Sequence, residues 1–174
     1  EDQDNFSEGS YKKALKSIEE KIFESEIVPV EIPGKKGSVV VGIDEEPGKV
    51  NFEKLRTLRP AFDKEGSVTA ANASSINDGA AALLLMSKEK AEELGLKPMA
   101  KIIAQASASK EPKWFTTAPV DAIQKVLKKA NMTKDQIDIF EINEAFAVVS
   151  LAVNKLLELD PAKVNVHGGA VALG

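Results

Sequence analysis

The sequence predicts an α/β fold, and its second half carries the pattern that indicates this class. A β-branched run at 137–142 leads into a long apolar stretch that ends near Leu159, and a short apolar run follows at 164–166. Alternation of strand-like and helix-like segments is typical of layered α/β domains. A change of composition near Pro98 indicates a domain boundary, which divides the chain into residues 1–97 and 98–174.

The first third of the chain predicts a helix, a hairpin and a surface excursion. Asp4 can cap a helix over 5–23, in which apolar residues recur with helical spacing. Two β-branched runs, 27–32 and 39–43, flank a Pro-Gly-Lys-Lys-Gly sequence, which predicts two strands joined by a turn. Residues 44–64 are charged and interrupted by proline, so we expect them to cross the surface.

The middle of the chain predicts four short elements. A turn of helix over 75–79 and a buried strand over 80–86 come first, because small residues give way there to a continuous apolar run. A helix follows over 88–94 and ends at Gly95. We expect a further strand over 100–108.

The second half predicts two longer helices. Residues 120–130 form an amphipathic pattern whose apolar stripe contains Ile123, Val126 and Leu127. The stretch that begins after Asn143 is apolar on nearly all sides, so we expect a helix that is covered by protein on both sides.

The composition excludes several kinds of site and partner. The 174 residues contain no cysteine and one histidine, His167. Disulfides, thiolate ligands, cysteine nucleophiles and multi-histidine metal sites are therefore excluded within these residues. The net charge of −4 argues against a general nucleic-acid-binding protein, and no apolar run approaches the length of a membrane span. We expect neither nucleic acid nor a membrane as a partner.

The strongest local signal for chemistry is the sequence Ile-Asn-Glu-Ala-Phe at 142–146. Polar side chains at the carboxyl end of a strand lie where α/β sheets bind ligands. The carboxamide of Asn143 can both donate and accept a hydrogen bond. The alternative is an N-cap with a purely structural hydrogen bond, which the residues alone favour because capping is common.

Three weaker signals each leave two interpretations open. Small and hydroxyl residues at 72–81 suit either close approach of a ligand or a tightly packed turn. His167, beside two glycines, is either a general base or a partly buried histidine next to a close backbone approach. Trp114 and Phe115 either anchor a loop or line a pocket.

Together, the sequences NASSINDGAA, EINEAF and NVHGGAVALG resemble the thiolase family, in their order and in their spacing, across nearly the whole chain. The resemblance implies the thiolase fold, in which two similar halves form five layers, α-β-α-β-α. This chain would hold part of that fold. Residues 1–97 match the later part of the loop domain and the end of the N-terminal half, and residues 98–174 match most of the C-terminal half.

The resemblance also implies an activity. Thiolases of the short-chain type catalyse the reversible Claisen condensation of two acetyl-CoA molecules to acetoacetyl-CoA, or the thiolysis of short 3-ketoacyl-CoA. The substrate is a coenzyme A thioester, and no covalent cofactor is expected. The alternatives are a longer-chain 3-ketoacyl-CoA thiolase of β-oxidation and a non-catalytic CoA-binding or assembly module. The resemblance further implies a homodimer or homotetramer in the mitochondrial matrix, with the cytoplasm as the alternative.

Three catalytic groups of the family find no match in this chain. The resemblance implies that the nucleophilic cysteine lies before Glu1, that the catalytic histidine follows Gly174 in a Gly-His-Pro motif, and that a second cysteine lies further on. His167 matches a different position and is not the activating base. We therefore expect an internal segment of a thiolase, and we expect the isolated 174 residues to show no acyl transfer.

The remaining site residues follow from matching positions in the family motifs. Asn143 matches the asparagine that holds a water molecule facing the thioester oxygen, and it is the catalytic residue expected here. Ser74 matches a serine that hydrogen-bonds the pantetheine arm of CoA, and Phe62 a residue near the adenine end. Phe115 and Phe146 match residues that line the pocket. Where some relatives carry an arginine near the CoA phosphates, this chain offers only Lys49.

A potassium site is the last expectation from the resemblance. Phe115 resembles the potassium-responsive branch of the family, in which a tyrosine hydroxyl and backbone carbonyl groups bind K⁺ near the CoA site. The matching positions in this chain are Tyr11, Ala70, Ala71, Ala73 and Val171.

Overall fold

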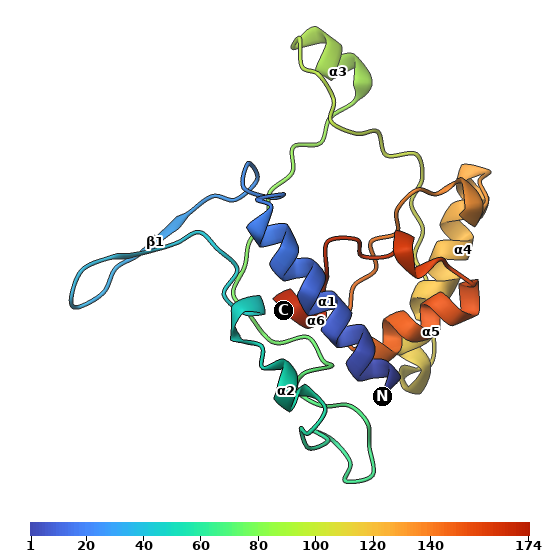
Figure 1. Cartoon of the computed structure of the whole chain (residues 1–174). Coiled ribbons are helices and arrows are strands. Elements are labelled where there is room, and N and C mark those ends of the chain that lie inside the picture. Colours follow the sequence, from blue (N-terminus) through green and yellow to red (C-terminus); the bar gives the residue numbers. More distant parts are fainter.

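The computed structural model describes residues 1–174 and contains six helices and one two-stranded sheet (Figure 1). The helices are α1 (Asp2–Glu19), α2 (Phe52–Leu55), α3 (Lys88–Glu93), α4 (Ala118–Ala130), α5 (Ala147–Leu157) and α6 (Ala170–Leu173). The strands are β1 (Val30–Ile32) and β2 (Val39–Val41). Four 3₁₀ helices complete the list: η1 (Pro47–Lys49), η2 (Pro112–Thr117), η3 (Lys134–Gln136) and η4 (Pro161–Lys163).

Helix α1 begins earlier than the sequence predicts and uses Asp4 differently. The N-cap position is Glu1, without a capping hydrogen bond from its side chain, so the prediction that Asp4 caps this helix is wrong. Asp2 and Asp4 instead occupy the first turn, where negative charge interacts favourably with the helix dipole. The Asp4 carboxylate also accepts a hydrogen bond from Asn72 Nδ2 at 3.1 Å, which ties α1 to a distant loop.

The buried face of α1 consists of small side chains. Ser7, Ser10, Ala14 and Ser17 recur every three or four residues and are buried. Their size allows the backbone around Gly168 to approach closely. A Cβ atom at Gly168 would lie 2.7 Å from the carbonyl oxygen of Ser10, and its φ of +86° also favours glycine. The segment that leads into α6 is therefore packed directly on α1.

The hydrophobic core lies between α4, α5 and the loops that follow α5. Its buried members are Val120, Val149, Val153, Leu159 and Val164. These side chains come from segments that extend from Val120 to Val164, so their burial holds the second half of the chain together.

Helix α5 is only partly covered. Its buried residues are Ala147, Val149, Ser150 and Val153, whereas Leu156 is 57% exposed. The expectation of a helix covered on both sides is therefore wrong. In this structure α5 packs against α1 and α4, and Val148 and Leu156 face outward.

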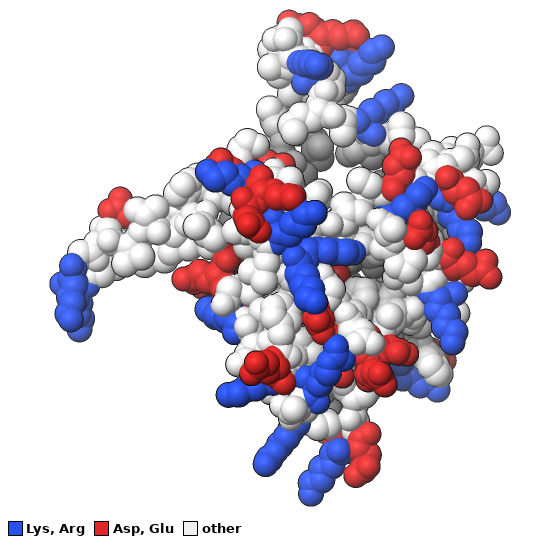
Figure 2. All heavy atoms as spheres, viewed as in Figure 1, with Lys and Arg blue, Asp and Glu red and all other residues white.

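The predicted hairpin is confirmed, and it forms an arm that projects from the body (Figure 1). Strands β1 and β2 are antiparallel, with Val30 opposite Val41 and Ile32 opposite Val39. Figure 2 shows that this arm is mostly uncharged along its length and carries Lys or Arg side chains at its tip, whereas both signs of charge are mixed over the visible face of the body. Residues 44–64 cross the surface as expected and add η1 and α2.

The other predicted strands are wrong as strands. Residues 80–86 and 100–108 run as extended chain on either side of α3, and no backbone hydrogen bond pairs them with a neighbour (Figure 1). Residues 137–142 and 164–166 meet in one isolated parallel bridge between Phe140 and Val164. A strand requires continuous pairing with a second segment, and within this chain such continuous pairing occurs only in the hairpin.

The predicted burial of 80–86 is also wrong, as is the turn of helix over 75–79. Leu83, Leu84 and Leu85 are 89%, 81% and 70% exposed. By contrast, α3 and α4 are confirmed, and α3 ends as expected before Gly95, whose φ is +64°. No helix in the structure combines the length and the apolar character that a membrane crossing would require.

We predict that Gly168→Ala lowers the free energy of unfolding of the protein by roughly 2–4 kcal/mol, because the added Cβ meets α1 and strains a left-handed residue. Gly9→Ala is the matched control. No atom lies within 4 Å of a Cβ at Gly9, and alanine in a helix is more stable than glycine by about 0.5–1 kcal/mol. Urea denaturation measures the free energy of unfolding of both variants, and equal effects of the two substitutions would contradict the packing of Gly168 on α1.

Candidate active site

Two motifs that lie about 70 residues apart in sequence pair directly in the structure. Residues 72–74 run antiparallel to residues 145–147, with a bridge between Ala73 and Phe146. Ser74 N donates to Ala145 O at 3.0 Å, and Ala147 N donates to Asn72 O at 2.9 Å. This pairing places the small-residue motif beside the Asn-Glu-Ala-Phe motif at the start of α5.

Three of the predicted CoA-binding residues gather at this pairing. The rings of Phe62 and Phe146 pack edge to face, with 6.1 Å between their centres. Ser74 lies next to the bridge and is half-buried, with its hydroxyl 3.3 Å from the carbonyl oxygen of Ser75. Phe62 remains 77% exposed, so much of its ring surface is available to a ligand.

Asn143 lies in a surface cavity of about 410 Å³ together with Phe115. The Asn143 side chain is exposed, and its carboxamide has no hydrogen-bond partner within the chain. The N-cap position of α5 is Phe146, so the interpretation of Asn143 as a helix cap is wrong. Other residues that line the cavity include Thr116, Pro119, Ala122, Ile123, Ile142, Ala145 and Val149.

Phe115 therefore lines a pocket, although the sequence left a loop anchor as the alternative. It lies in η2, directly before α4, and is 57% exposed. The predicted site residues thus form two groups. Phe115 and Asn143 share a cavity. Ser74 and Phe146 lie in the strand-like pairing, and Phe62 packs on the ring of Phe146. Ala145 belongs to both groups, because it lines the cavity and accepts the hydrogen bond from Ser74.

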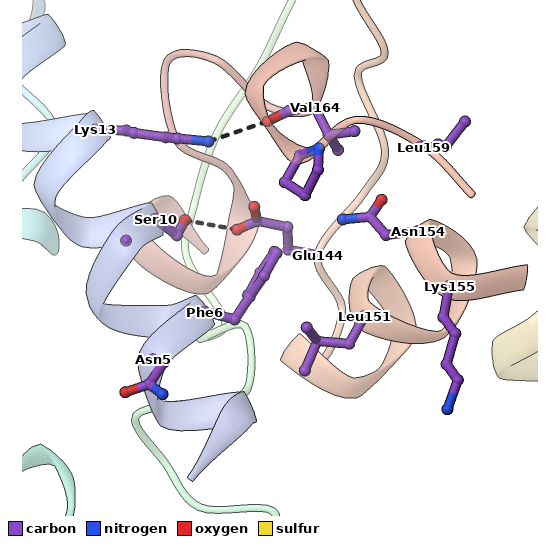
Figure 3. Close-up of a pocket in the computed structure, with 12 residues that line it drawn as sticks. Asn5, Phe6, Ser10, Lys13, Glu144, Leu151, Asn154, Lys155, Leu159 and Val164 are labelled. Carbon is purple, nitrogen blue, oxygen red and sulfur yellow. Dashed lines mark hydrogen bonds between the residues drawn. The ribbon is translucent and has the colours of Figure 1, made fainter. Parts of the chain in front are cut away.

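Glu144 is a polar residue of the site that the sequence interpretation did not assign. Its side chain is 1% exposed. One carboxylate oxygen accepts hydrogen bonds from Ser10 Oγ at 2.7 Å and from Val171 N at 3.2 Å. The other accepts a hydrogen bond from Asn165 Nδ2 at 2.8 Å. Figure 3 shows Ser10 on α1 reaching this carboxylate at the wall of a second cavity, whose volume is about 440 Å³.

Asn165 is the second residue that the interpretation of the sequence overlooked. Its carboxamide accepts from Ile142 N and donates to Ile142 O, each at 2.8 Å, while the same amide nitrogen donates to Glu144. Asn165 is buried and adopts a φ of +45°, an uncommon conformation for a residue other than glycine. Asparagine is among the residues that tolerate it best, which is a signal that the sequence alone does not display.

The residues of the predicted potassium site lie on α1, on the loop at 70–73 and on α6. Tyr11 is half-buried, and burial, together with the nearby charge of Glu46, raises the pKa of its phenol. Ala71 and Val171 are buried, whereas Ala70 is exposed. The Tyr11 hydroxyl makes no hydrogen bond to these carbonyl groups, so the structure does not join the predicted ligands directly.

Two further candidates have structural roles. His167 Nδ1 lies 3.2 Å from Ser17 Oγ, and the Phe23 ring packs edge to face on the imidazole at 5.5 Å. These contacts fit the interpretation of His167 as a partly buried histidine. Lys49 Nζ is paired with the Glu46 carboxylate at 2.6 Å, and that hydrogen bond raises the pKa of the lysine. Lys49 is thus already engaged with an anion of its own chain.

Comparison with known proteins matches both halves of the chain to one family. The family model described as thiolase, N-terminal domain, matches residues 1–89, and the one described as thiolase, C-terminal domain, matches residues 96–174. The acetyl-CoA acetyltransferases of Schizosaccharomyces pombe and Yarrowia lipolytica are 52% and 55% identical over 99% and 100% of this chain. A cytosolic acetyl-CoA acetyltransferase of Gibberella zeae is 50% identical. The chain spans about 44% of the length of these relatives.

Solved structures agree in fold over 99% of the chain and about 44% of their own length. An acetyl-CoA acetyltransferase from Bacillus anthracis has a TM-score of 0.96 at 48% identity. The Acat5 thiolase from Ascaris suum, solved in complex with coenzyme A, has a TM-score of 0.94 at 46% sequence identity. Human mitochondrial 3-ketoacyl-CoA thiolase has a TM-score of 0.94 at 36% sequence identity. The partial thiolase fold expected from the sequence is confirmed, and the chain belongs to the thiolase family.

Proposed function

We propose that this chain is part of a thiolase that condenses two acetyl-CoA molecules to acetoacetyl-CoA, or cleaves short 3-ketoacyl-CoA in the reverse direction. The observation that carries the proposal is the position of Asn143. Its exposed carboxamide lies in a cavity whose other lining residues are mostly apolar. The next residue, Glu144, is buried and hydrogen-bonded, and it holds the backbone in place.

The role of Asn143 in this proposal is electrostatic. As a thiolate attacks an acyl thioester, negative charge develops on the carbonyl oxygen. A donor that is already oriented toward that oxygen, directly or through a bound water, stabilises the charge without having to reorganise. The thiol and the imidazole of the reaction must come from outside these 174 residues, because the chain contains no cysteine and His167 is engaged with Ser17 and Phe23.

The pairing of the two motifs supports a role in CoA binding. Phe62 offers an exposed aromatic face and Ser74 a hydroxyl, and both lie beside Phe146 at the start of α5. An extended pantetheine arm needs such a mixture of apolar surface and directional polar groups. In this proposal Ser74 bonds the arm, Phe62 packs toward the adenine end, and Phe115 and Phe146 border the acyl group.

The preference for acetyl over longer acyl groups rests on relatedness and on the shape of the cavity. Relatives named acetyl-CoA acetyltransferase are 50–55% identical to the chain, whereas the human 3-ketoacyl-CoA thiolase is 36% identical. The large ring of Phe115 shares the cavity with Asn143, and in this proposal it limits the acyl chain to the acetoacetyl group. A non-catalytic CoA-binding module has no comparable support.

The proposed partners follow from the same family. The substrate is an acyl-CoA, and we propose a homodimer or homotetramer as the assembly. The compartment is the mitochondrial matrix or the cytoplasm, and the cytosolic relative from Gibberella zeae supports the second.

A potassium ion near the CoA site is part of the proposal. The donors at the matching positions suit this ion, because K⁺ is typically held by carbonyl oxygens. The carbonyl groups of Ala70, Ala71 and Ala73 accept no hydrogen bond within the chain, which leaves them available as ligands. The raised pKa of Tyr11 keeps its phenol neutral, as a hydroxyl ligand requires.

In the full-length protein that contains this segment, we predict that Asn143→Ala lowers kcat for thiolysis of acetoacetyl-CoA by about 10²–10³-fold, with little change in KM for CoA. Gln124→Ala is the control, because it removes an exposed amide from α4 outside the cavity. Steady-state kinetics measures both variants. A change confined to KM would show that Asn143 contributes to binding and not to stabilisation of the oxyanion.

We also predict that the full-length protein cleaves acetoacetyl-CoA faster in K⁺ than in Na⁺ at equal ionic strength, which keeps the screening of charges the same. Tyr11→Phe removes the proposed hydroxyl ligand and should reduce the difference between the two salts, while thermal unfolding in Na⁺ checks that the variant remains folded. Equal rates in the two salts for the unaltered protein would rule out the potassium site.

A further inference from the structure

Asn143 and Glu144 are neighbours in sequence but face different surroundings. Successive side chains of an extended segment point to opposite sides. Asn143 accordingly lines the cavity that contains Phe115, and Glu144 points into the interior and lines the cavity drawn in Figure 3. Whatever holds the Glu144 side chain in place therefore also fixes the backbone from which the Asn143 side chain projects.

The Glu144 carboxylate is held from three separate parts of the chain. Ser10 lies on α1, Val171 in the first turn of α6, and Asn165 in the loop between α5 and α6. The fit leaves no spare room, since a Cβ at Gly169 would lie 2.5–2.7 Å from the carboxylate atoms. A buried carboxylate that accepts three hydrogen bonds has its charge satisfied and has little freedom to rotate.

Asn165 holds the residue on the other side of Asn143. Its carboxamide forms both hydrogen bonds to the backbone of Ile142, and its amide nitrogen also donates to Glu144. Lys13 in turn fixes the loop, because its ammonium group donates to the carbonyl oxygens of Val164 and Asn165 at 3.1 and 3.2 Å. The residue before Asn143 and the residue after it are thus clamped by one buried asparagine.

We propose that Glu144 and Asn165 are positioning residues for the Asn143 carboxamide. They act without touching the substrate, by holding the backbone on both sides of Asn143 and by joining it to α1 and α6. This inference rests on the proposed function, because the proposed function assigns to Asn143 the stabilisation of the oxyanion.

Glu144→Gln is the most informative substitution because it keeps the size of the side chain. Gln presents one oxygen and one NH₂ group, whereas the carboxylate receives hydrogen bonds on both oxygens. Asn165 cannot turn over to accept from that NH₂ group, because its own oxygen already accepts from Ile142 N. Two donors must therefore face each other in one contact, and the hydrogen bonds that hold residue 144 in place become weaker.

The experiment is a double-mutant cycle in the full-length protein with Asn143→Ala and Glu144→Gln. We expect Glu144→Gln alone to lower kcat by about 10–100-fold, with KM for CoA within about twofold of the original value. In the Asn143→Ala background it should lower kcat by no more than about twofold, because the group that it positions is gone. Asp138→Asn, which neutralises an exposed carboxylate upstream in the same segment, should leave kcat unchanged.

The cycle separates the possible failures. If Glu144→Gln lowers kcat equally in both backgrounds, Glu144 supports the fold in general and the inference is wrong. If Asn143→Ala leaves kcat intact, the proposed function of Asn143 itself fails. Should Glu144→Gln not fold, Ser10→Ala replaces it in the cycle. That change removes one of two donors to a single carboxylate oxygen, and we expect a several-fold loss of kcat that again disappears without Asn143.

Discussion

A carboxylate in the interior of a protein imposes conditions on everything around it. Glu144 is 1% exposed, and transferring its charge from water into the interior is very costly unless hydrogen-bond donors replace the lost water. The chain meets this condition with donors from α1, from the loop at Asn165 and from the start of α6. The small face of α1 and the paired glycines before α6 allow these segments to approach closely enough to provide the donors.

Local patterns in the sequence predicted the elements that depend on local interactions. The hairpin, α3 and α4 follow from β-branched runs, a glycine stop signal and an amphipathic stripe, and all three are present. The strands predicted at 80–86, 100–108 and 137–142 are not formed, because a strand depends on a neighbour that no local pattern reveals. The predicted helix starts were also misplaced. Asp4 and Asn143 are residue types that often cap helices, but the N-cap positions are Glu1 and Phe146. Asp4 instead accepts a hydrogen bond from Asn72, and Asn143 faces the cavity.

The candidate site was predictable to the extent that its residues lie in recognisable motifs. The family resemblance selected Phe62, Ser74, Phe115, Asn143 and Phe146, and the structure distributes them between a cavity and the pairing beside it. Glu144 and Asn165 escaped notice because their partners are distant in sequence. The three donors to Glu144 lie 134, 21 and 27 residues away, and no spacing rule connects such positions.

The extended run of leucines before α3 affects how the 174 residues behave when they are handled as a separate polypeptide. Leu83, Leu84 and Leu85 present apolar side chains to water, and the backbone between them offers unsatisfied donors and acceptors. Such a bare edge is a template onto which an identical edge of another molecule can add by cross-molecule pairing, which is the first step of aggregation. Charged or proline substitutions within this run are the appropriate remedy for precipitation during purification.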